Sequence, residues 1–133
     1  MDNVYLVTKC FVVNEQGHIL VLRRSKQSKV RPGEWDLPGG MVEHGEDPNV
    51  SNVREIKEET SIAANHINIL TITTENKLDY ILTFFYKASY EKGEVSLSDE
   101  HTNYKWISAE EFKGLDLPEK FHRAASQLDE FVV

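Results

Sequence analysis

The sequence predicts an α/β domain in which a mixed β-sheet packs against two principal helices. Two observations carry this prediction: several short runs are rich in β-branched and aromatic residues, as strands are, and two segments show helical spacing and capping residues. The length of 133 residues is close to the ~150 residues of an average domain. Because the sequence shows no repeat or linker, we expect a single domain over residues 1–133.

The expected strands are separated by turn-forming residues. Residues 5–13 and 19–24 flank Gly17, whose freedom to adopt a positive φ predicts a hairpin. Two short strands are expected on either side of a Pro-Gly-Gly turn at residues 38–40. These two strands and the later ones are placed at residues 35–37, 41–43, 67–74, 78–90 and 104–107.

The helices are predicted from capping residues and apolar spacing. Asp47 can cap a helix that begins at Pro48, a residue tolerated at the first helical position, and that runs to about Thr60. Ser108 opens a short capped turn of helix. A last amphipathic helix is expected over residues 118–131. Its apolar positions are Phe121, Ala124, Ala125, Leu128 and Phe131.

The composition narrows the range of partners. Fifteen Lys and Arg against 22 Asp and Glu give a formal net charge of −7. Duplex nucleic acid and anionic membranes are also negative, so we expect neither as a partner, and any phosphate would be bound through a cation. The one cysteine, Cys10, excludes an intrachain disulfide and is expected to be buried in its apolar run. Since we identify no signal peptide or membrane span in the sequence, the expected location is the cytoplasm.

The helix predicted over residues 48–60 combines an apolar arc with an acidic one. On a helical wheel, three aliphatic residues and one threonine fall on an arc that is expected to face the core. These residues are Val50, Val53, Ile56 and Thr60. Glu55, Glu58 and Glu59 cluster on the nearly opposite side of the helix.

The three glutamates disfavour an isolated helix. Glu55 repels Glu58 and Glu59, which lie three and four residues later and near the negative end of the helix dipole. A solvated acidic face is one interpretation of this charge run. The other is a divalent cation site, since Mg²⁺ prefers carboxylate oxygens and keeps positions open for substrate phosphates. We favour the cation site because locally unfavourable residues tend to occur at functional sites.

The residues that flank the acidic arc agree with a cation site. The glycines of the Pro-Gly-Gly turn allow a close backbone approach, and a glycine carbonyl there could serve as a further metal ligand. Arg54 lies four residues before Glu58 and can hold its carboxylate, and Glu46 is a second natural partner of Arg54.

This stretch resembles the Nudix box, written G-x5-E-x7-R-E-U-x-E-E-x-G-U with U aliphatic. The match begins at Gly40, continues through Glu46 and Arg54, and ends at Ile62, and the lead-in Trp-Asp-Leu-Pro-Gly-Gly is also similar to that of the family. The one departure is Ser61, where the family has glycine; we expect it to alter the geometry of the following loop rather than the chemistry. The resemblance implies the α/β/α sandwich fold of the family for the whole chain.

The resemblance implies hydrolysis of the pyrophosphate linkage of a nucleoside diphosphate derivative, with Mg²⁺ as the cofactor and Mn²⁺ as a substitute. The expected substrate is a nucleoside triphosphate, normal or oxidised. The alternatives are a dinucleoside polyphosphate or nucleotide-sugar hydrolase, and a non-catalytic nucleotide-binding sensor. A homodimer is one of the open oligomeric states, since small family members often dimerise.

The resemblance also implies roles for individual residues. Glu58 and Glu59 would be metal ligands, and Glu55 would be either a ligand or the base that deprotonates the attacking water. By the same analogy, the Gly39 carbonyl would bind the metal.

Three further positions follow from the same resemblance. Glu46 and Arg54 would orient the metal ligands. A carboxylate outside the box is common in the family, and Glu100 is the candidate here, with a solvated loop acid as its alternative. The neighbouring His101 is expected to be solvent-exposed and is given no role.

Two further groups are candidates for substrate binding. Arg23 and Arg24 belong to a basic cluster that either clamps phosphate or forms a solvated loop; they lie on opposite faces of one strand, so only one can point into a given pocket. Tyr80 shares a strand face with Phe84 and Tyr86, and these rings either stack a nucleobase or belong to the core. Tyr80 lies 18 residues after the box, a spacing associated in the family with dinucleoside polyphosphate hydrolases.

Overall fold

A mixed sheet of seven strands lies at the centre of the computed structural model, which describes residues 3–128. The strands are β1 (Val4–Val13), β2 (Ile19–Arg24), β3 (Trp35–Asp36), β4 (Gly39–Met41), β5 (Ala63–Asn76), β6 (Tyr80–Lys92) and β7 (His101–Ile107). Their order is β3-β2-β1-β6-β5, with β4 also paired to β1 and β7 also paired to β2. Strands β1 and β6 run parallel and the remaining pairs are antiparallel, so the predicted mixed sheet is confirmed.

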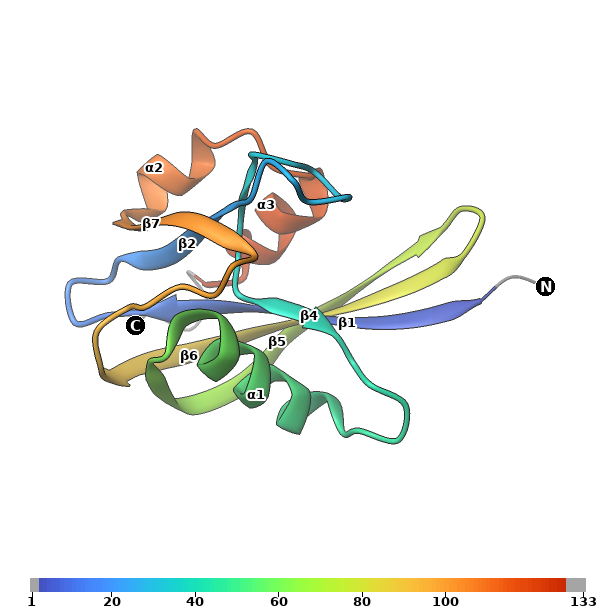
Figure 1. Ribbon diagram of the computed structural model, residues 1–133, viewed down its shortest axis with the longest axis horizontal. Helices are drawn as coiled ribbons and strands as arrows, with labels where there is room; N and C mark the ends of the chain where they lie inside the picture. The colour runs from blue at the N-terminus through green and yellow to red at the C-terminus, as the bar shows by residue number, and fades with distance from the viewer. Residues whose placement is uncertain (1–2, 129–133) are drawn as a thin grey trace.

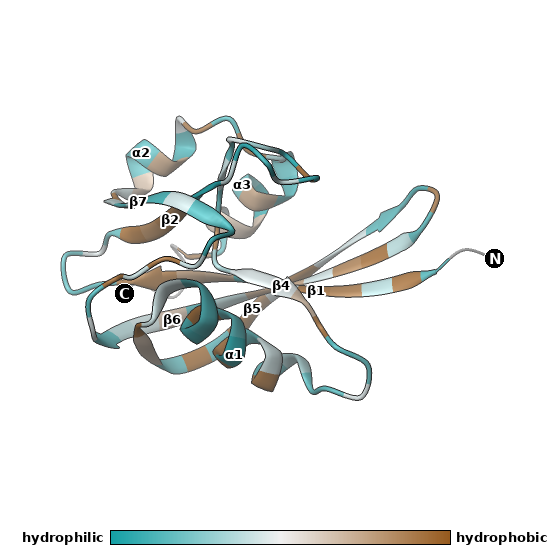
Figure 2. Ribbon diagram, viewed as in Figure 1, coloured by the Kyte–Doolittle hydropathy of each residue, from teal (hydrophilic) through white to brown (hydrophobic). Residues whose placement is uncertain are grey.

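Helices cover both faces of the sheet (Figure 1). They are α1 (Pro48–Thr60) on one face, and α2 (Ala109–Lys113) and α3 (Glu119–Ser126) on the other. Alternate residues of β1 face opposite sides: Phe11 packs with Phe112 and Phe121 of the α2–α3 layer, whereas Cys10 packs in the cluster that contains Ile56 of α1. Strands β1 and β2 are mostly apolar and α1 is mostly polar (Figure 2). The chain therefore has the α/β/α sandwich fold that the sequence predicted.

Several local predictions are confirmed. Gly17 has a φ of 77° in the turn between β1 and β2. The Asp47 side chain accepts a hydrogen bond from the Asn49 backbone at 2.7 Å and caps α1, whose first residue is Pro48. Cys10 is fully buried. These features follow from local backbone preferences and hydrophobicity, which the sequence states directly.

Two strands begin earlier than predicted because β-bulges break their alternation. Strand β5 begins at Ala63 rather than at residue 67, and its register shifts around His66, which has a φ of 51°. Strand β7 begins at His101 rather than at residue 104, and its pairing with β2 shifts between Arg23 and Arg24. A bulge inserts an extra residue and interrupts the period of two on which strand prediction depends.

The last helix ends earlier than predicted within the residues that the structure describes. Helix α3 ends at Ser126, and Phe131, expected in its apolar stripe, lies outside the described residues. Phe121 and Ala124 are buried in the stripe as expected. In the part of the chain that the structure describes, no helix combines the length and the apolar character needed to cross a membrane.

The predicted core-facing arc of α1 is wrong. Val50 and Val53 are exposed at 58% and 50%, while Ile56 and Thr60 are buried as expected. The other buried residues of the helix are Ser51, Asn52 and Glu59. At ~100° per residue, the buried arc is turned by roughly 90° from the predicted one. Apolar spacing could not show this because polar side chains occupy much of the buried face.

Candidate functional site

Helix α1 holds the three predicted acidic residues in three different environments. The Glu58 side chain is 58% exposed, that of Glu55 is 13% exposed, and Glu59 is buried at 4%. The helical wheel placed all three opposite the core-facing arc, and this placement is wrong for Glu59. Because the three lie at successive angles around α1, they form a band that runs from solvent toward the sheet.

The turn into β4 brings the backbone against this acidic band. The Gly39 N–H donates a hydrogen bond to Glu59 Oε1 at 2.9 Å. A Cβ on Gly39, whose φ is 151°, would collide with the backbone oxygen of Thr8, and one on Gly40 would lie 2.8 Å from the Glu55 carboxyl carbon. The close approach inferred from the Pro-Gly-Gly turn is thus present. The role of the Gly39 carbonyl as a metal ligand stays a prediction.

Arg54 ties three carboxylates together. Its Nε and Nη2 donate to the two carboxylate oxygens of Glu46 at 2.8 and 3.0 Å. Its Nη1 donates to Glu55 Oε1 at 3.0 Å and to Glu58 Oε2 at 3.1 Å. The hydrogen bonds from Arg54 lower the pKa of Glu46 to about 2. Arg54 is therefore positioned to orient both Glu55 and Glu58, and it is itself fixed by Glu46.

The loop before β7 completes the acidic group. Glu59, Glu100 and His101 each offer one ligand atom, and these atoms all lie within 4.8 Å of one another. The loop is fixed to the end of α1, since the Ser98 N–H donates to the Glu59 carbonyl at 3.3 Å. The expectation that His101 is solvent-exposed is wrong: its exposure is 7%, and its Nδ1 has no hydrogen-bond partner among the described residues.

The electrostatics of this group fit a divalent cation. Burial raises the pKa of Glu59 to about 8, although the Lys9 ammonium and the Gly39 N–H act in the opposite direction. Burial also lowers the pKa of His101 to about 4, so its imidazole is neutral at neutral pH. Buried carboxylates and a neutral imidazole are groups that bind divalent ions, and an ion would offset the cost of burying the charge of Glu59. The donor set therefore suits a metal site.

A second polar cluster beside this group was missed by the sequence analysis. Asp36 is fully buried and accepts from Lys9 at 2.9 Å, from Arg24 at 2.8 Å and from Arg31 at 3.0 Å. Burial alone would raise the pKa of Asp36, but the three cations together hold it well below its usual range. The available signal was Lys9, a lone lysine inside an apolar strand. We call these four residues the Asp36 cluster.

A family model described as the NUDIX domain matches residues 6–130. The chain belongs to this family. Its enzyme class, a Nudix pyrophosphohydrolase, is the one predicted from the sequence.

Individual relatives agree with the family assignment. A MutT-like protein of Streptomyces ambofaciens is 32% identical over 100 residues, which cover 75% of this chain and 61% of that relative, so the chain spans about three fifths of its length. A nucleoside triphosphatase, NudI, of Klebsiella pneumoniae strain 342 is 26% identical over 120 residues, which cover 81% of this chain and 85% of that protein. The crystal structure of a MutT protein from Methanosarcina mazei Go1 superimposes with a TM-score of 0.85 at 29% identity and covers 97% of this chain and 95% of that one.

The departure of the Nudix box at Ser61 leaves the helix end intact. Ser61 adopts the left-handed conformation, with φ 64° and ψ 3°, that a glycine would take there. Its N–H donates to the Lys57 carbonyl at 2.9 Å, and its Oγ donates to the Ser96 carbonyl at 3.1 Å. The serine thus keeps the left-handed exit from α1 and adds a hydrogen bond to the loop that leads to Glu100.

The residues considered for substrate binding lie in different places. Arg24 is held in the Asp36 cluster, whereas Arg23 donates to the Gly33 carbonyl at 2.9 Å and lies over the Trp35 ring. Tyr80 is partly exposed at the start of β6, five residues before Phe85, which pairs with Lys9. At ~3.3 Å per residue, Tyr80 is about 17 Å along the sheet from that pair. The structure thus brings Arg24, but not Tyr80, to the acidic group.

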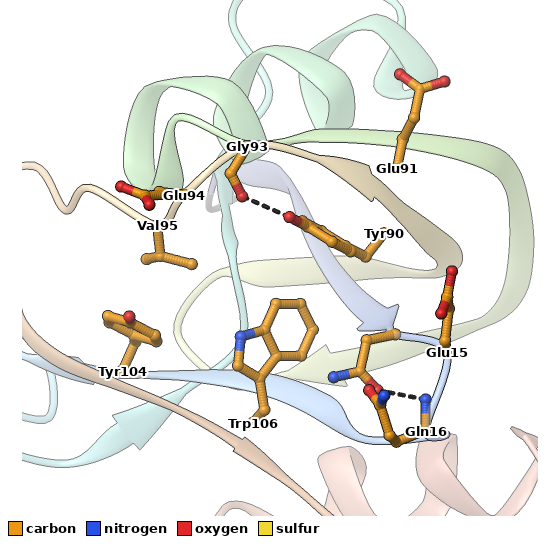
Figure 3. A pocket seen from close by; sticks show the side chains of 10 residues that line it. Glu15, Gln16, Tyr90, Glu91, Gly93, Glu94, Val95, Tyr104 and Trp106 are labelled. Atoms are coloured by element: carbon orange, nitrogen blue, oxygen red, sulfur yellow. Dashed lines mark hydrogen bonds between the residues drawn. The ribbon is translucent and has the colours of Figure 1, made fainter.

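One hollow lies at the other end of β7 (Figure 3). It measures about 670 Å³. Among the described residues that line it are three glutamates and no basic side chain. The lining residues are Asn14, Glu15, Gln16, Tyr90, Glu91, Gly93, Glu94, Val95, Tyr104 and Trp106. Three carboxylates with no counter-charge would repel a polyphosphate, so this hollow is a poor site for such a substrate.

Proposed function

We propose that this Nudix pyrophosphohydrolase hydrolyses a nucleoside triphosphate, normal or oxidised, with Mg²⁺ held by the glutamates of α1. The observation that carries the proposal is Glu59, a carboxylate that is buried at 4% exposure beside Glu55 and Glu100. A polyanion can approach such a site only if cations bridge the carboxylates and the phosphate oxygens. The similarity to a Klebsiella protein named as a nucleoside triphosphatase supports this substrate class.

The proposed metal ligands are Glu58, Glu59 and the Gly39 carbonyl, with Glu100 as a further carboxylate from the loop. When bound, Mg²⁺ would neutralise the phosphate oxygens and make the phosphorus more electrophilic. The Glu58 side chain is exposed and is oriented by the hydrogen bond from Arg54 Nη1, whereas Glu59 is buried and held by the Gly39 N–H. The two residues therefore offer one solvent-facing and one buried carboxylate.

Glu55 is the proposed general base. Burial raises its pKa above the ordinary value, so its carboxylate has a higher affinity for a proton than an exposed glutamate has. In the proposed step the water oxygen bonds to phosphorus, the water proton passes to Glu55, and the phosphoanhydride bond to the leaving group breaks. Arg54 and Glu46 position Glu55 through the hydrogen bond from Arg54 Nη1.

The Asp36 cluster is the proposed contact for the nucleotide. Three cationic side chains surround one carboxylate there, so the cluster carries more positive than negative charge. The Arg24 side chain is 23% exposed and can reach a bound anion. We restrict this part of the proposal to Arg24, because Arg23 and Tyr80 lie away from the acidic group.

The test is a panel of nucleoside triphosphates, oxidised triphosphates, dinucleoside polyphosphates and nucleotide sugars, incubated with the purified protein and Mg²⁺. We expect a triphosphate to be hydrolysed, and we expect Glu58→Gln to abolish hydrolysis. Glu119→Gln is the matched control, because Glu119 is exposed on α3 at the far side of the sheet. Product analysis shows which phosphoanhydride bond breaks.

Two outcomes would contradict the proposal. Nucleotide binding without turnover under any divalent metal would favour the sensor alternative. Hydrolysis by Glu58→Gln at the rate of the control would remove Glu58 from the metal site.

A further inference from the structure

A β-bulge turns His101 into the acidic group. Arg23 pairs with Asn103 and Arg24 pairs with His101, so Thr102 is the extra residue in β7. Bulges commonly re-aim a side chain next to a functional site. Here His101 is buried at 7% exposure, whereas Thr102 and Asn103 are exposed.

The imidazole of His101 has no evident structural partner. Its Nδ1 is buried and accepts or donates no hydrogen bond among the described residues. Buried polar atoms without a partner are rare in folded proteins, because such an atom loses its bond to water and gains nothing in return. The orphaned nitrogen therefore calls for a ligand.

The neighbours of His101 are those of a metal site. One ring nitrogen of His101 and one carboxylate oxygen each from Glu59 and Glu100 lie within 4.8 Å of one another. Ligand atoms that share one small divalent ion, each about 2.1 Å from it, lie about 3 to 4 Å apart. Side-chain movements of about an ångström would therefore bring all three atoms to one ion. The nearby Lys9 and Arg24 are neutralised in part by Asp36, which reduces their repulsion of a cation.

We infer that His101 is a nitrogen ligand of the metal site, together with Glu59 and Glu100, and that it makes this site prefer first-row transition ions such as Co²⁺ and Zn²⁺ over Mg²⁺. Magnesium favours oxygen ligands, whereas imidazole suits the later transition ions. This inference rests on the proposed function for the existence of a cation site and adds an imidazole to its ligands.

The test is calorimetric titration of CoCl₂ and MgCl₂, without nucleotide, into the wild-type protein and into His101→Asn. Replacing a residue that merely orients a metal ligand weakens metal binding ~10- to 100-fold, so removing a ligand should weaken Co²⁺ binding at least about tenfold. We expect Mg²⁺ affinity to change less than about threefold, because oxygen ligands remain. Glu59→Gln should weaken the binding of both ions.

His66→Asn is the matched control. His66 is exposed on β5 with a φ of 51°, and asparagine tolerates that conformation. If His101→Asn and His66→Asn bind Co²⁺ equally well, the inference is wrong, while the proposed function stands. If the wild-type protein binds neither ion, with or without nucleotide, the proposed function fails first.

A measurement on the unmutated protein covers the case in which His101→Asn does not fold. The ¹⁵N resonances of the His101 ring are recorded as ZnCl₂ or MgCl₂ is added. A shift of one ring nitrogen with Zn²⁺ and not with Mg²⁺ supports the inference. If the protein binds Zn²⁺ and the ring resonances of His101 do not shift, the inference is wrong.

Discussion

Replacing Glu59 by glutamine should stabilise the metal-free protein and remove its metal site at the same time. Glutamine has nearly the same shape, and its amide oxygen can still accept the hydrogen bond from the Gly39 N–H. The substitution therefore removes the negative charge from a residue that is only 4% exposed, with little change in packing. Because glutamine keeps the shape of glutamate and lacks its charge, the change in the free energy of unfolding measures the cost of burying that charge.

The magnitude follows from the pKa of Glu59, which burial raises from its ordinary value of 4.5 to about 8. The folded state holds this proton more tightly than the unfolded state, so stability is full below pH 4.5 and falls as the pH rises to 8. Each pH unit in this interval removes about 1.4 kcal/mol. The metal-free protein should lose roughly 3 kcal/mol by pH 7 and roughly 4 kcal/mol by pH 8, and Glu59→Gln should avoid this loss.

The assay is urea unfolding in EDTA at pH 5.5, 7.0 and 8.5. The free energy of unfolding of Glu59→Gln, minus that of the wild type, should grow with pH, whereas the difference for the exposed control Glu119→Gln should stay constant. Adding Mg²⁺ should stabilise the wild type and leave Glu59→Gln unchanged. A Glu59→Gln advantage that is the same at all three pH values, or a variant less stable than the wild type at pH 8.5, would refute the reasoning.

Two other substitutions test the surroundings of the glutamates. Ser61→Gly should be more stable than Ser61→Ala by about 1 kcal/mol in thermal or urea unfolding. Both variants lose the hydrogen bond to the Ser96 carbonyl, but only alanine keeps the strain of the left-handed conformation. Equal stabilities would contradict the assigned conformation. Arg54→Lys should reduce kcat about 10- to 100-fold with a small change in stability. The reason is that lysine cannot reproduce the four hydrogen bonds that position Glu46, Glu55 and Glu58. An unchanged kcat would show that these contacts do not orient the site.

The fold could be predicted from the sequence where local rules and tertiary structure agree. The Gly17 turn and the Asp47 cap depend on backbone preferences, and both appear as expected. The apolar run of β1 predicted that Cys10 is buried, and it is fully buried. The starts of β5 and β7 could not be predicted, because a bulge is set by pairing with another strand.

The candidate site could be predicted from the sequence only in part. The spacing of Arg54, Glu46 and Glu58 on a helix and its preceding loop predicted their contacts, because i, i+4 neighbours meet on any helix. Lys9 and its partner Asp36 lie 27 residues apart in sequence, and no local pattern links them. His101 was missed because its direction depends on the bulge opposite Arg24.

One assumption accounts for both the rotated helix and the hidden imidazole. Sequence patterns treat glutamate and histidine as surface residues, since burying either without a partner is unfavourable. A helix wheel built on that rule turns Glu59 outward and Val53 inward, whereas the structure does the reverse. The sandwich tolerates this arrangement because the Gly39 N–H and Lys9, from two different parts of the chain, compensate for part of the Glu59 charge. The proposed cation would compensate for the rest. The protein therefore departs from its sequence pattern at buried charged residues, which lie on segments that meet only in the folded state. Its proposed chemistry lies at the same residues.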